Sequence, residues 1–158
     1  MDSPAIEAVS ALSSLTSAII DTSSLIYLTK IKCFSLVAGS CKLVTIPDVV
    51  NEYGENISDI AVINVSMENG DTDQKLIRIC VKDKLMLISE DKKLLLDAQE
   101  NNIPYFNSLM MLNFLLLKKK IRQKEYASLL EKLKSVARYR KDVWEFGAEV
   151  NNAISNLS

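Results

Sequence analysis

Short apolar runs alternate along the chain with stretches whose apolar residues recur every three or four positions. The runs lie at residues 18–20, 43–46, 60–65, 85–88 and 104–106. Unbroken runs of this length are typical of strands buried on both faces. The stretches between them have the periodicity of helices, at residues 25–37, 49–53, 73–82, 92–102 and 109–117. This alternation predicts a three-layer α/β/α fold with a short central parallel sheet and right-handed crossovers.

Turn and capping residues predict where these elements begin and end. The hydroxyl residues at 22–24 predict a polar turn that caps the following helix. Pro47 ends the second strand, and Asp48 is placed to cap the helix after it. Ser108 is placed in the same way before residues 109–117.

The chain divides by pattern into three parts of one domain. Residues 1–17 are rich in Ser and Ala, with a short helix at 6–15, and are predicted to be an N-terminal appendage. Residues 18–121 carry the strand and helix alternation. Residues 122–158 predict additional C-terminal helices, at 123–137 and 142–154, packed on the same domain. No linker rich in Gly, Pro or Ser separates these parts.

The amino-acid composition excludes several classes of catalytic and metal-binding site. The 158 residues include no histidine, which excludes Ser-His-Asp and Cys-His catalytic sites and histidine-bound zinc. The most apolar stretch, residues 109–117, is much shorter than the ~20 residues of a membrane span, so no membrane association is expected. Three cysteines without a C-x-x-C pair and an N-terminus without a basic start predict a cytoplasmic protein.

Four acids are placed near the carboxyl ends of predicted strands or at the start of helices. Asp21 directly follows the first strand, and Asp91 closely follows the strand at 85–88. Glu52 lies early in the helix after the second strand, and Asp73 opens another helix. In open parallel sheets the site lies beyond the carboxyl ends of the strands, so we expect these acids at one rim.

Carboxylates gathered at one rim repel one another unless a cation neutralises them. A set of oxygen ligands without nitrogen or sulfur suits Mg²⁺ or Mn²⁺, which would promote phosphodiester hydrolysis. Each acid also has a purely structural interpretation. Asp73 and Asp91 are both placed to act as helix caps, and Glu52 as a solvated surface charge. Asp71 competes with Asp73 within the triplet at 71–73.

The order of motifs resembles a PIN domain over roughly residues 18–121. The motifs are IIDTSSLIYL, IPDVVNEY, GDTDQKLI and LISEDKKL, followed by NIPYF and a hydrophobic helix. The resemblance implies a PIN-like fold and an endoribonuclease that uses Mg²⁺ or Mn²⁺. By position it makes Asp21, Glu52, Asp73 and Asp91 catalytic, with Asp21, Asp73 and Asp91 as metal ligands. Ser23 resembles the hydroxyl residue that steadies the first acid, and Asp71 and Glu90 are additional supporting acids.

Many small PIN proteins are similar to VapC-like toxins, so the resemblance also implies RNA as substrate, a possible antitoxin partner and a homodimer. The long segment before Asp21 and the helices beyond Ile121 depart from compact toxins. Two other functions remain open at this point. One is a catalytically inactive PIN-like module that binds RNA or protein, and the other is a haloacid-dehalogenase-type phosphatase, whose D-x-D after the first strand is absent here.

Nucleic acid would have to bind at local basic patches, because the net charge of −1 gives no global attraction. We predict RNA contacts at a cluster that follows the apolar helix. A second patch near residue 139 combines three cations with a tyrosine on which a base could stack. The first cluster is Lys118, Lys119, Lys120 and Arg122, with Lys124 nearby; the second is Arg138, Arg140 and Lys141 around Tyr139.

Overall fold

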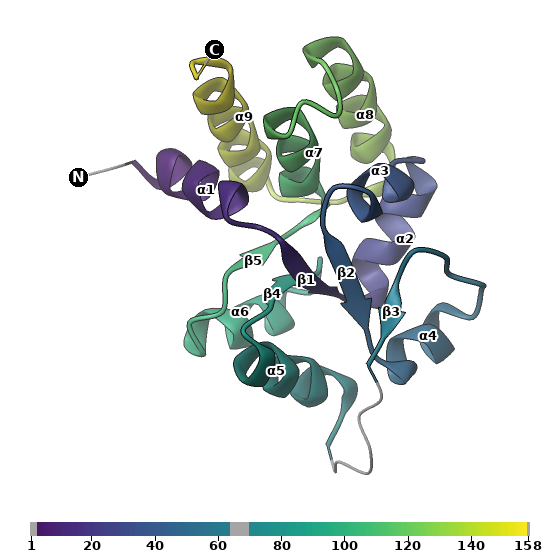
Figure 1. Cartoon of the computed structure of the whole chain (residues 1–158). Coiled ribbons are helices and arrows are strands. Elements are labelled where there is room, and N and C mark those ends of the chain that lie inside the picture. The colour runs from purple at the N-terminus through teal and green to yellow at the C-terminus, as the bar shows by residue number, and fades with distance from the viewer. Residues whose placement is uncertain (1–2, 64–69, 158) are drawn as a thin grey trace.

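Five parallel strands form one sheet in the order β3-β2-β1-β4-β5 (Figure 1). The structure, a computed structural model, describes residues 3–63 and 70–157. Every neighbouring pair of strands is parallel, as predicted from the buried apolar runs. The strands are β1 (Ser17–Ile20), β2 (Lys42–Thr45), β3 (Ala61–Val62), β4 (Met86–Ile88) and β5 (Tyr105–Phe106).

Helices cover both faces of the sheet, which confirms the predicted α/β/α layers (Figure 1). The chain moves in one direction from β1 to β3 and in the other from β4 to β5, so right-handed crossovers put the connecting helices on opposite faces. One face carries α2 (Thr22–Lys30), α3 (Phe34–Ala38), α4 (Pro47–Tyr53) and α7 (Ser108–Leu117). The other carries α5 (Thr72–Asp83) and α6 (Lys92–Glu100).

Three further helices, α1 (Pro4–Ser13), α8 (Gln123–Val136) and α9 (Lys141–Ser155), extend the layer that contains α7. The N-terminal helix α1 lies against α7 and α9, and its Ala5, Val9 and Leu12 are buried. The described part of the predicted appendage, residues 3–17, therefore contributes side chains to the common core. Within the described ranges, no helix has both the length and the apolar character that a bilayer crossing requires.

The predicted helix at residues 25–37 is wrong, because the chain breaks there into α2 and α3. Lys32 adopts a left-handed conformation with φ of 63°, and the amide of Cys33 donates to the carbonyl oxygen of Leu28 at 3.0 Å. A left-handed residue just after a helix is a common way to end it. The apolar periodicity continues across this break because both helices pack on the same core.

Two predicted caps are also wrong. Asp48 lies inside the first turn of α4, where Ile46 is the N-cap and provides no side-chain hydrogen bond. Asn107 rather than Ser108 caps α7, and its Oδ1 accepts from the amide of Met110 at 2.9 Å. The predicted strand at 60–65 is reduced to Ala61–Val62, with residues 64 and 65 outside the described part of the chain.

Candidate functional site

The strand order reverses between β1 and β4, whose carboxyl ends lie side by side. The register pairs Ile20 with Ile88, and the amide of Asp21 donates to the carbonyl oxygen of Ile88 at 2.9 Å. The connecting helices after these strands, α2 and α6, leave toward opposite faces of the sheet. A crevice at such a reversal is where open α/β sheets bind their ligands.

Asp21 is buried at this point, with 8% of its surface exposed. It is the N-cap of α2, so the helix begins at Thr22 and the predicted polar turn is absent. Its Oδ1 accepts from the amide of Thr22 at 2.8 Å. Its Oδ2 accepts from the hydroxyls of Ser89 at 3.0 Å and Ser23 at 3.3 Å. Both carboxylate oxygens of Asp21 are thus held by donors from the ends of β1 and β4.

The two serine hydroxyls are themselves oriented by the backbone after β4. Ser23 Oγ accepts from the amide of Glu90 at 3.0 Å, and Ser89 Oγ accepts from the amide of Asp91 at 3.0 Å. A hydroxyl that accepts from an amide has its proton free to donate to the carboxylate. These contacts join Ser23 to Asp21 and to the segment after β4, while its supporting role stays a prediction. Sequence reasoning missed Ser89, although it lies directly before the two acids.

Asp73 lies in the first turn of α5, partly buried, and faces other acids. Burial raises its pKa, and the negative charges of Asp91, Asp21 and Asp71 raise it further. Lys93 lowers the pKa, with the smallest effect of the five. No side chain or amide in the described ranges donates a hydrogen bond to the Asp73 carboxylate.

The alternatives left open for residues 71–73 can now be separated. Asp71 is the N-cap of α5, where its Oδ1 accepts from the amide of Gln74 at 2.8 Å. The side chain of Gln74 returns the contact to the amide of Asp71 at 3.0 Å, which completes a capping box. Asp71 therefore has a structural role, while Asp73 is the member of the triplet that interacts with Asp21 and Asp91.

Asp91 combines a structural role with a place at the rim. It is exposed, and its Oδ1 accepts from the amide of Leu94 at 3.1 Å as the N-cap of α6. Only one of its oxygens is recorded in this contact, so the capping interpretation and a ligand role are compatible.

Among the described residues, no hydrogen bond or ion pair joins Glu52 to the other acids. It is exposed on α4, and Asp48 instead links that helix to α5. Asp48 Oδ2 lies 2.9 Å from Lys75 Nζ and accepts from the Thr72 hydroxyl at 3.3 Å. The Lys75 hydrogen bond is the main reason that the pKa of Asp48 is lowered. Sequence reasoning missed this pair, for which the chain gives no local signal because 27 residues separate its members.

Glu90 turns away from the other acids and into the helical layer. Its carboxylate accepts from the hydroxyls of Ser24, Tyr139 and Ser108, and from the Ser108 amide at 3.0 Å. Burial raises the pKa of Glu90, and these hydrogen bonds lower it. The prediction that Glu90 supports the acidic site is therefore met only by its amide, which orients Ser23.

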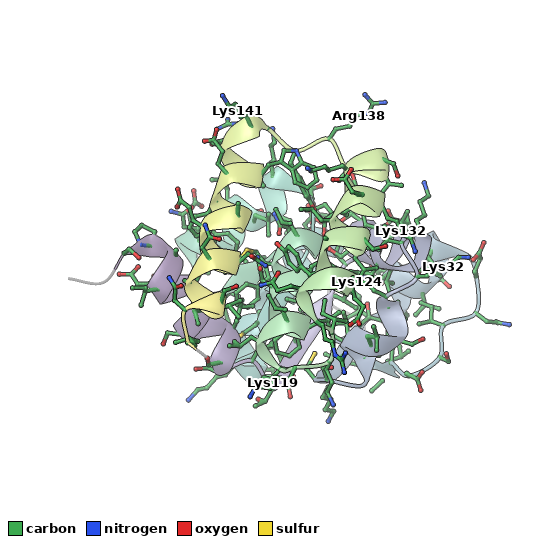
Figure 2. All side chains as sticks on the ribbon, turned by 90° about the horizontal axis from the view of Figure 1, so that it is seen from above. Lys32, Lys119, Lys124, Lys132, Arg138 and Lys141 are labelled. Atoms are coloured by element: carbon green, nitrogen blue, oxygen red, sulfur yellow. The ribbon has the colours of Figure 1, made fainter. Side chains whose placement is uncertain are left out.

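The predicted RNA-binding cluster lies far from the carboxylates. Lys118 to Lys120 follow the C-terminal end of α7, whereas the first residue of that helix, Ser108, contacts Glu90 beside Asp91. A ten-residue helix is about 15 Å long. In Figure 2, Lys119 and Arg138 lie at opposite ends of α8. The second predicted patch is thus the one nearer the acids.

The interpretation of Tyr139 as a base-stacking residue is wrong, because its neighbours already use both its ring and its hydroxyl. The ring lies 4.9 Å from that of Trp144 and 6.5 Å from that of Tyr27, centroid to centroid. The hydroxyl donates to Glu90. Arg140 in turn is paired with Asp142 at 2.7 Å, which partly neutralises the second patch.

The carboxylate set fits a hard dication in donor type and in charge. Asp21, Asp73 and Asp91 offer oxygen ligands alone, and the mutual repulsion recorded at Asp73 is what a cation would relieve. As they stand, no three acidic or cysteine side chains of the described ranges are arranged closely enough to hold a metal ion. A metal role for these acids is therefore a proposal, taken up below.

Comparison with known proteins adds a distant structural similarity. No family model and no curated protein matches the sequence. A solved structure of a PilT N-terminus domain protein from the hyperthermophilic archaeon Sulfolobus solfataricus P2 is similar over 79% of this chain and 99% of the archaeal chain. The two share 16% sequence identity, with a TM-score of 0.45. A likeness this low transfers neither family nor activity, so the function must be argued from the chain's own residues.

Proposed function

We propose that this chain is a metal-dependent ribonuclease of the PIN-domain type. The observation that carries the proposal is the environment of Asp73, a partly buried carboxylate with acids around it and no hydrogen-bond donor among the described residues. Burying a charged carboxylate beside other acids, without a donor or a cation, lowers the stability of the folded protein. It becomes favourable when Mg²⁺ or Mn²⁺ binds between Asp73, Asp21 and Asp91.

When bound, the cation would polarise a phosphoryl oxygen and lower the pKa of a coordinated water. The protein's part is to position the ligands. Ser23 and Ser89 hold Oδ2 of Asp21, and both hydroxyls are set by amides that follow β4. The resemblance to PIN domains supports RNA as the substrate and adds Glu52 as a fourth catalytic acid, carried on α4.

The experiment is cleavage of a mixed RNA pool by purified protein with Mn²⁺, with EDTA, and by an Asp21→Asn/Asp91→Asn variant. With Mn²⁺ the unmodified chain is expected to cut RNA, and the double variant is not. The matched control is Glu100→Gln, which removes an exposed acid at the far end of the helix that Asp91 caps. Cleavage that persists in EDTA or in the double variant would refute the proposal.

A catalytically inactive PIN-like module is the second candidate, and the structural roles of Asp91 and Asp71 favour it. Both carboxylates accept hydrogen bonds from helix amides, so two of the predicted acids are explained without any metal. Such a module would bind RNA or protein with an affinity that does not depend on Mn²⁺. Calorimetric titration with Mn²⁺ separates the two, because only the nuclease requires a binding isotherm that Asp73→Asn abolishes.

A toxin of a toxin–antitoxin pair is the finer form of the proposed function. It implies an antitoxin that blocks the acidic rim and a homodimer as the active form. Expression of the chain should then arrest growth, and the Asp21→Asn/Asp91→Asn variant should not. A chain that cuts RNA in solution but leaves growth unchanged would keep the nuclease and remove the toxin role.

A further inference from the structure

A cavity of about 310 Å³ opens between α2, α3 and the segment that follows α4. Ligand pockets in proteins are typically about 300–1,000 Å³, so the space suits a small planar group. The lining combines two aromatic rings with hydroxyls, an amide and a cation. It comprises Leu25, Thr29, Lys32, Phe34, Ser35, Tyr53, Asn56, Ile57 and Ser58.

The two rings, those of Phe34 and Tyr53, are partly buried at the cavity wall. Neither ring contacts another aromatic ring within residues 3–63 and 70–157, unlike Tyr139, whose ring contacts those of Tyr27 and Trp144. The Tyr53 hydroxyl donates to Thr29 Oγ1 at 3.4 Å, which ties α4 to α2. Aromatic rings at the wall of a concave site are suited to stack on a planar base.

The side-chain amide of Asn56 could form hydrogen bonds with the edge of a nucleobase. Its side chain is exposed at the cavity and has no hydrogen-bond partner in the described part of the chain. A carboxamide offers two donors and one acceptor, which is the complement of a nucleobase edge. Unpaired bases of single-stranded RNA are typically bound by this combination of stacking and edge hydrogen bonds.

Positive charge flanks the cavity. Lys32 lines it, and Lys132 of α8 lies close to the adjacent Cys33. Burial raises the pKa of the Cys33 thiol to about 12, and the Lys132 charge lowers it. Figure 2 shows Lys32, Lys132 and Lys124 on the same side of the molecule as α8. None of these three lysines forms an ion pair within the described ranges, whereas Lys134 on the same helix pairs with Glu131 at 3.4 Å.

Helix α2 links the cavity to Asp21, which caps the start of that helix. Leu25 forms part of the cavity wall, and the Leu25 amide donates to the Asp21 carbonyl oxygen at 3.1 Å. Thr29, which also lines the cavity, is eight residues beyond Asp21, roughly 12 Å of helix rise. A strand with one phosphate at Asp21 would therefore reach the cavity with a nucleotide further along the strand and not with the adjacent one.

We propose that this cavity binds a nucleobase of single-stranded RNA, stacked against Phe34 and Tyr53, with Lys32 and Lys132 neutralising the adjoining phosphates. The inference rests on the proposed function and adds a binding site beside α2, the helix that Asp21 caps, apart from the predicted cluster at 118–122. It makes single strands the substrate class.

The test measures RNA affinity apart from cleavage. Fluorescein-labelled single-stranded RNA is titrated with the Asp73→Asn chain, to prevent cutting, carrying Phe34→Leu or Tyr53→Leu as a second change. Each of the two Leu variants is expected to bind RNA about 5- to 100-fold more weakly, because stacking of one base on an aromatic ring contributes a binding free energy of that order. Tyr53→Phe keeps the ring and should bind as the parent does.

A charge test uses two lysines with the same backbone conformation. Lys32 and Lys84 both have positive φ, 63° and 55°, so replacement by Gly relieves the same backbone strain in each. Lys84 lies after α5, beyond the cavity lining. Lys32→Gly should weaken RNA binding and flatten its salt dependence, while Lys84→Gly leaves both unchanged.

Photocrosslinking of 4-thiouridine RNA to the unmodified chain identifies the residues that contact RNA. This test does not depend on whether the variants fold. Crosslinks at Phe34 or Tyr53 support the inference even if no RNA is cut, in which case the nuclease proposal fails alone. Cleavage with unchanged affinity and KM in both Leu variants overturns the inference and keeps the nuclease. Binding restricted to double-stranded RNA, or crosslinks confined to residues 118–122, also overturns it.

Discussion

Asp73 and Glu90 are acids near the same end of the sheet, and burial raises the pKa of both, yet their surroundings are opposite. The other groups acting on Asp73 are mainly acids, namely Asp91, Asp21 and Asp71. The other groups acting on Glu90 are all hydrogen-bond donors, from Ser24, Tyr139 and Ser108.

This difference indicates two different roles. A buried carboxylate surrounded by donors already has its charge compensated by the protein and joins the elements that provide the donors. For Glu90 these elements are α2, α7 and the segment before α9. A carboxylate surrounded by acids lacks that compensation and gains from a cation that the protein does not provide. The proposed metal site depends on Asp73 belonging to the second kind.

The Asp73→Asn substitution is expected to have the largest effect, and that effect is a loss of RNA cleavage. The change keeps the shape of the side chain but removes a metal ligand, and metal stabilisation of the transition state is worth several kcal/mol. We expect cleavage to fall more than about 100-fold. Stability should be unchanged or slightly higher, because like-charge repulsion is removed. Single-turnover cleavage and urea unfolding measure the two effects.

Asp83→Asn is the matched control, because it neutralises an exposed acid at the last residue of α5. Its cleavage rate should equal that of the unmodified chain. If Asp73→Asn cuts RNA as fast as this control, Asp73 is not a ligand, and the contrast with Glu90 loses its functional meaning.

Glu90→Ala should have the largest effect on stability. The hydroxyls of Ser24, Ser108 and Tyr139 would lose their acceptor, and each buried group left unpaired costs about 1–3 kcal/mol before relaxation. We expect a loss of roughly 2–4 kcal/mol in the free energy of urea unfolding. Glu90→Gln, which still accepts hydrogen bonds, should cost less. Glu131→Ala, an exposed acid on α8, should change stability by less than about 0.5 kcal/mol; a similar small loss for Glu90→Ala would show that its hydrogen bonds are not structural.

Mn²⁺ should stabilise the folded chain through the acids around Asp73. A ligand that binds only the folded state at ten times its Kd adds about 1.4 kcal/mol. The thermal midpoint should rise with Mn²⁺ in the unmodified chain and in Glu90→Gln, and should not respond in Asp73→Asn. An equal rise in all three would place the cation elsewhere on the surface.

Much of the fold followed from the sequence, because the strands are buried apolar runs separated by helices. The strand order, and with it the reversal between β1 and β4, came only from the structure. The break at Lys32 did not follow from the sequence either, since helical periodicity records only which side faces the core and both α2 and α3 face the same core. The packing of α1 was also missed. Its buried Ala5, Val9 and Leu12 have a helical spacing, but their partners lie on helices more than 95 residues away.

The site was predictable in part for the same reason. Asp21 and Asp91 follow paired strands, so their position at one rim was implied by local pattern. The turn of Glu90 toward Tyr139 was not, because 49 residues separate them and adjacent acids look alike in sequence. The direction of each side chain and its contacts with residues distant in sequence decide which of several neighbouring acids can bind a ligand.

Asp48 provides a third case, an acid compensated by a cation of the protein itself. Lys75 lowers the pKa of Asp48 below its ordinary value of 3.8. A lowered pKa means that the pair stabilises the folded chain above that ordinary value, and that this stabilisation is lost as the pH falls through the folded pKa. Because the pair is partly exposed, the expected contribution is only about 0.2–1 kcal/mol.

Lys75→Met should therefore lower the free energy of unfolding slightly at pH 7, and the difference from the unmodified chain should shrink toward pH 3. Urea unfolding at both pH values measures it. Glu52→Gln changes an exposed acid on the same helix as Asp48, with no hydrogen bond or ion pair to any residue of the described ranges, and should leave both values unchanged. An effect of Lys75→Met that is equal at both pH values would mean that packing of the lysine stem, and not compensation of Asp48, joins α4 to α5. Asp48 would then no longer be an example of an acid whose charge is compensated by a cation of the protein, in the way that the proposed metal would compensate Asp73.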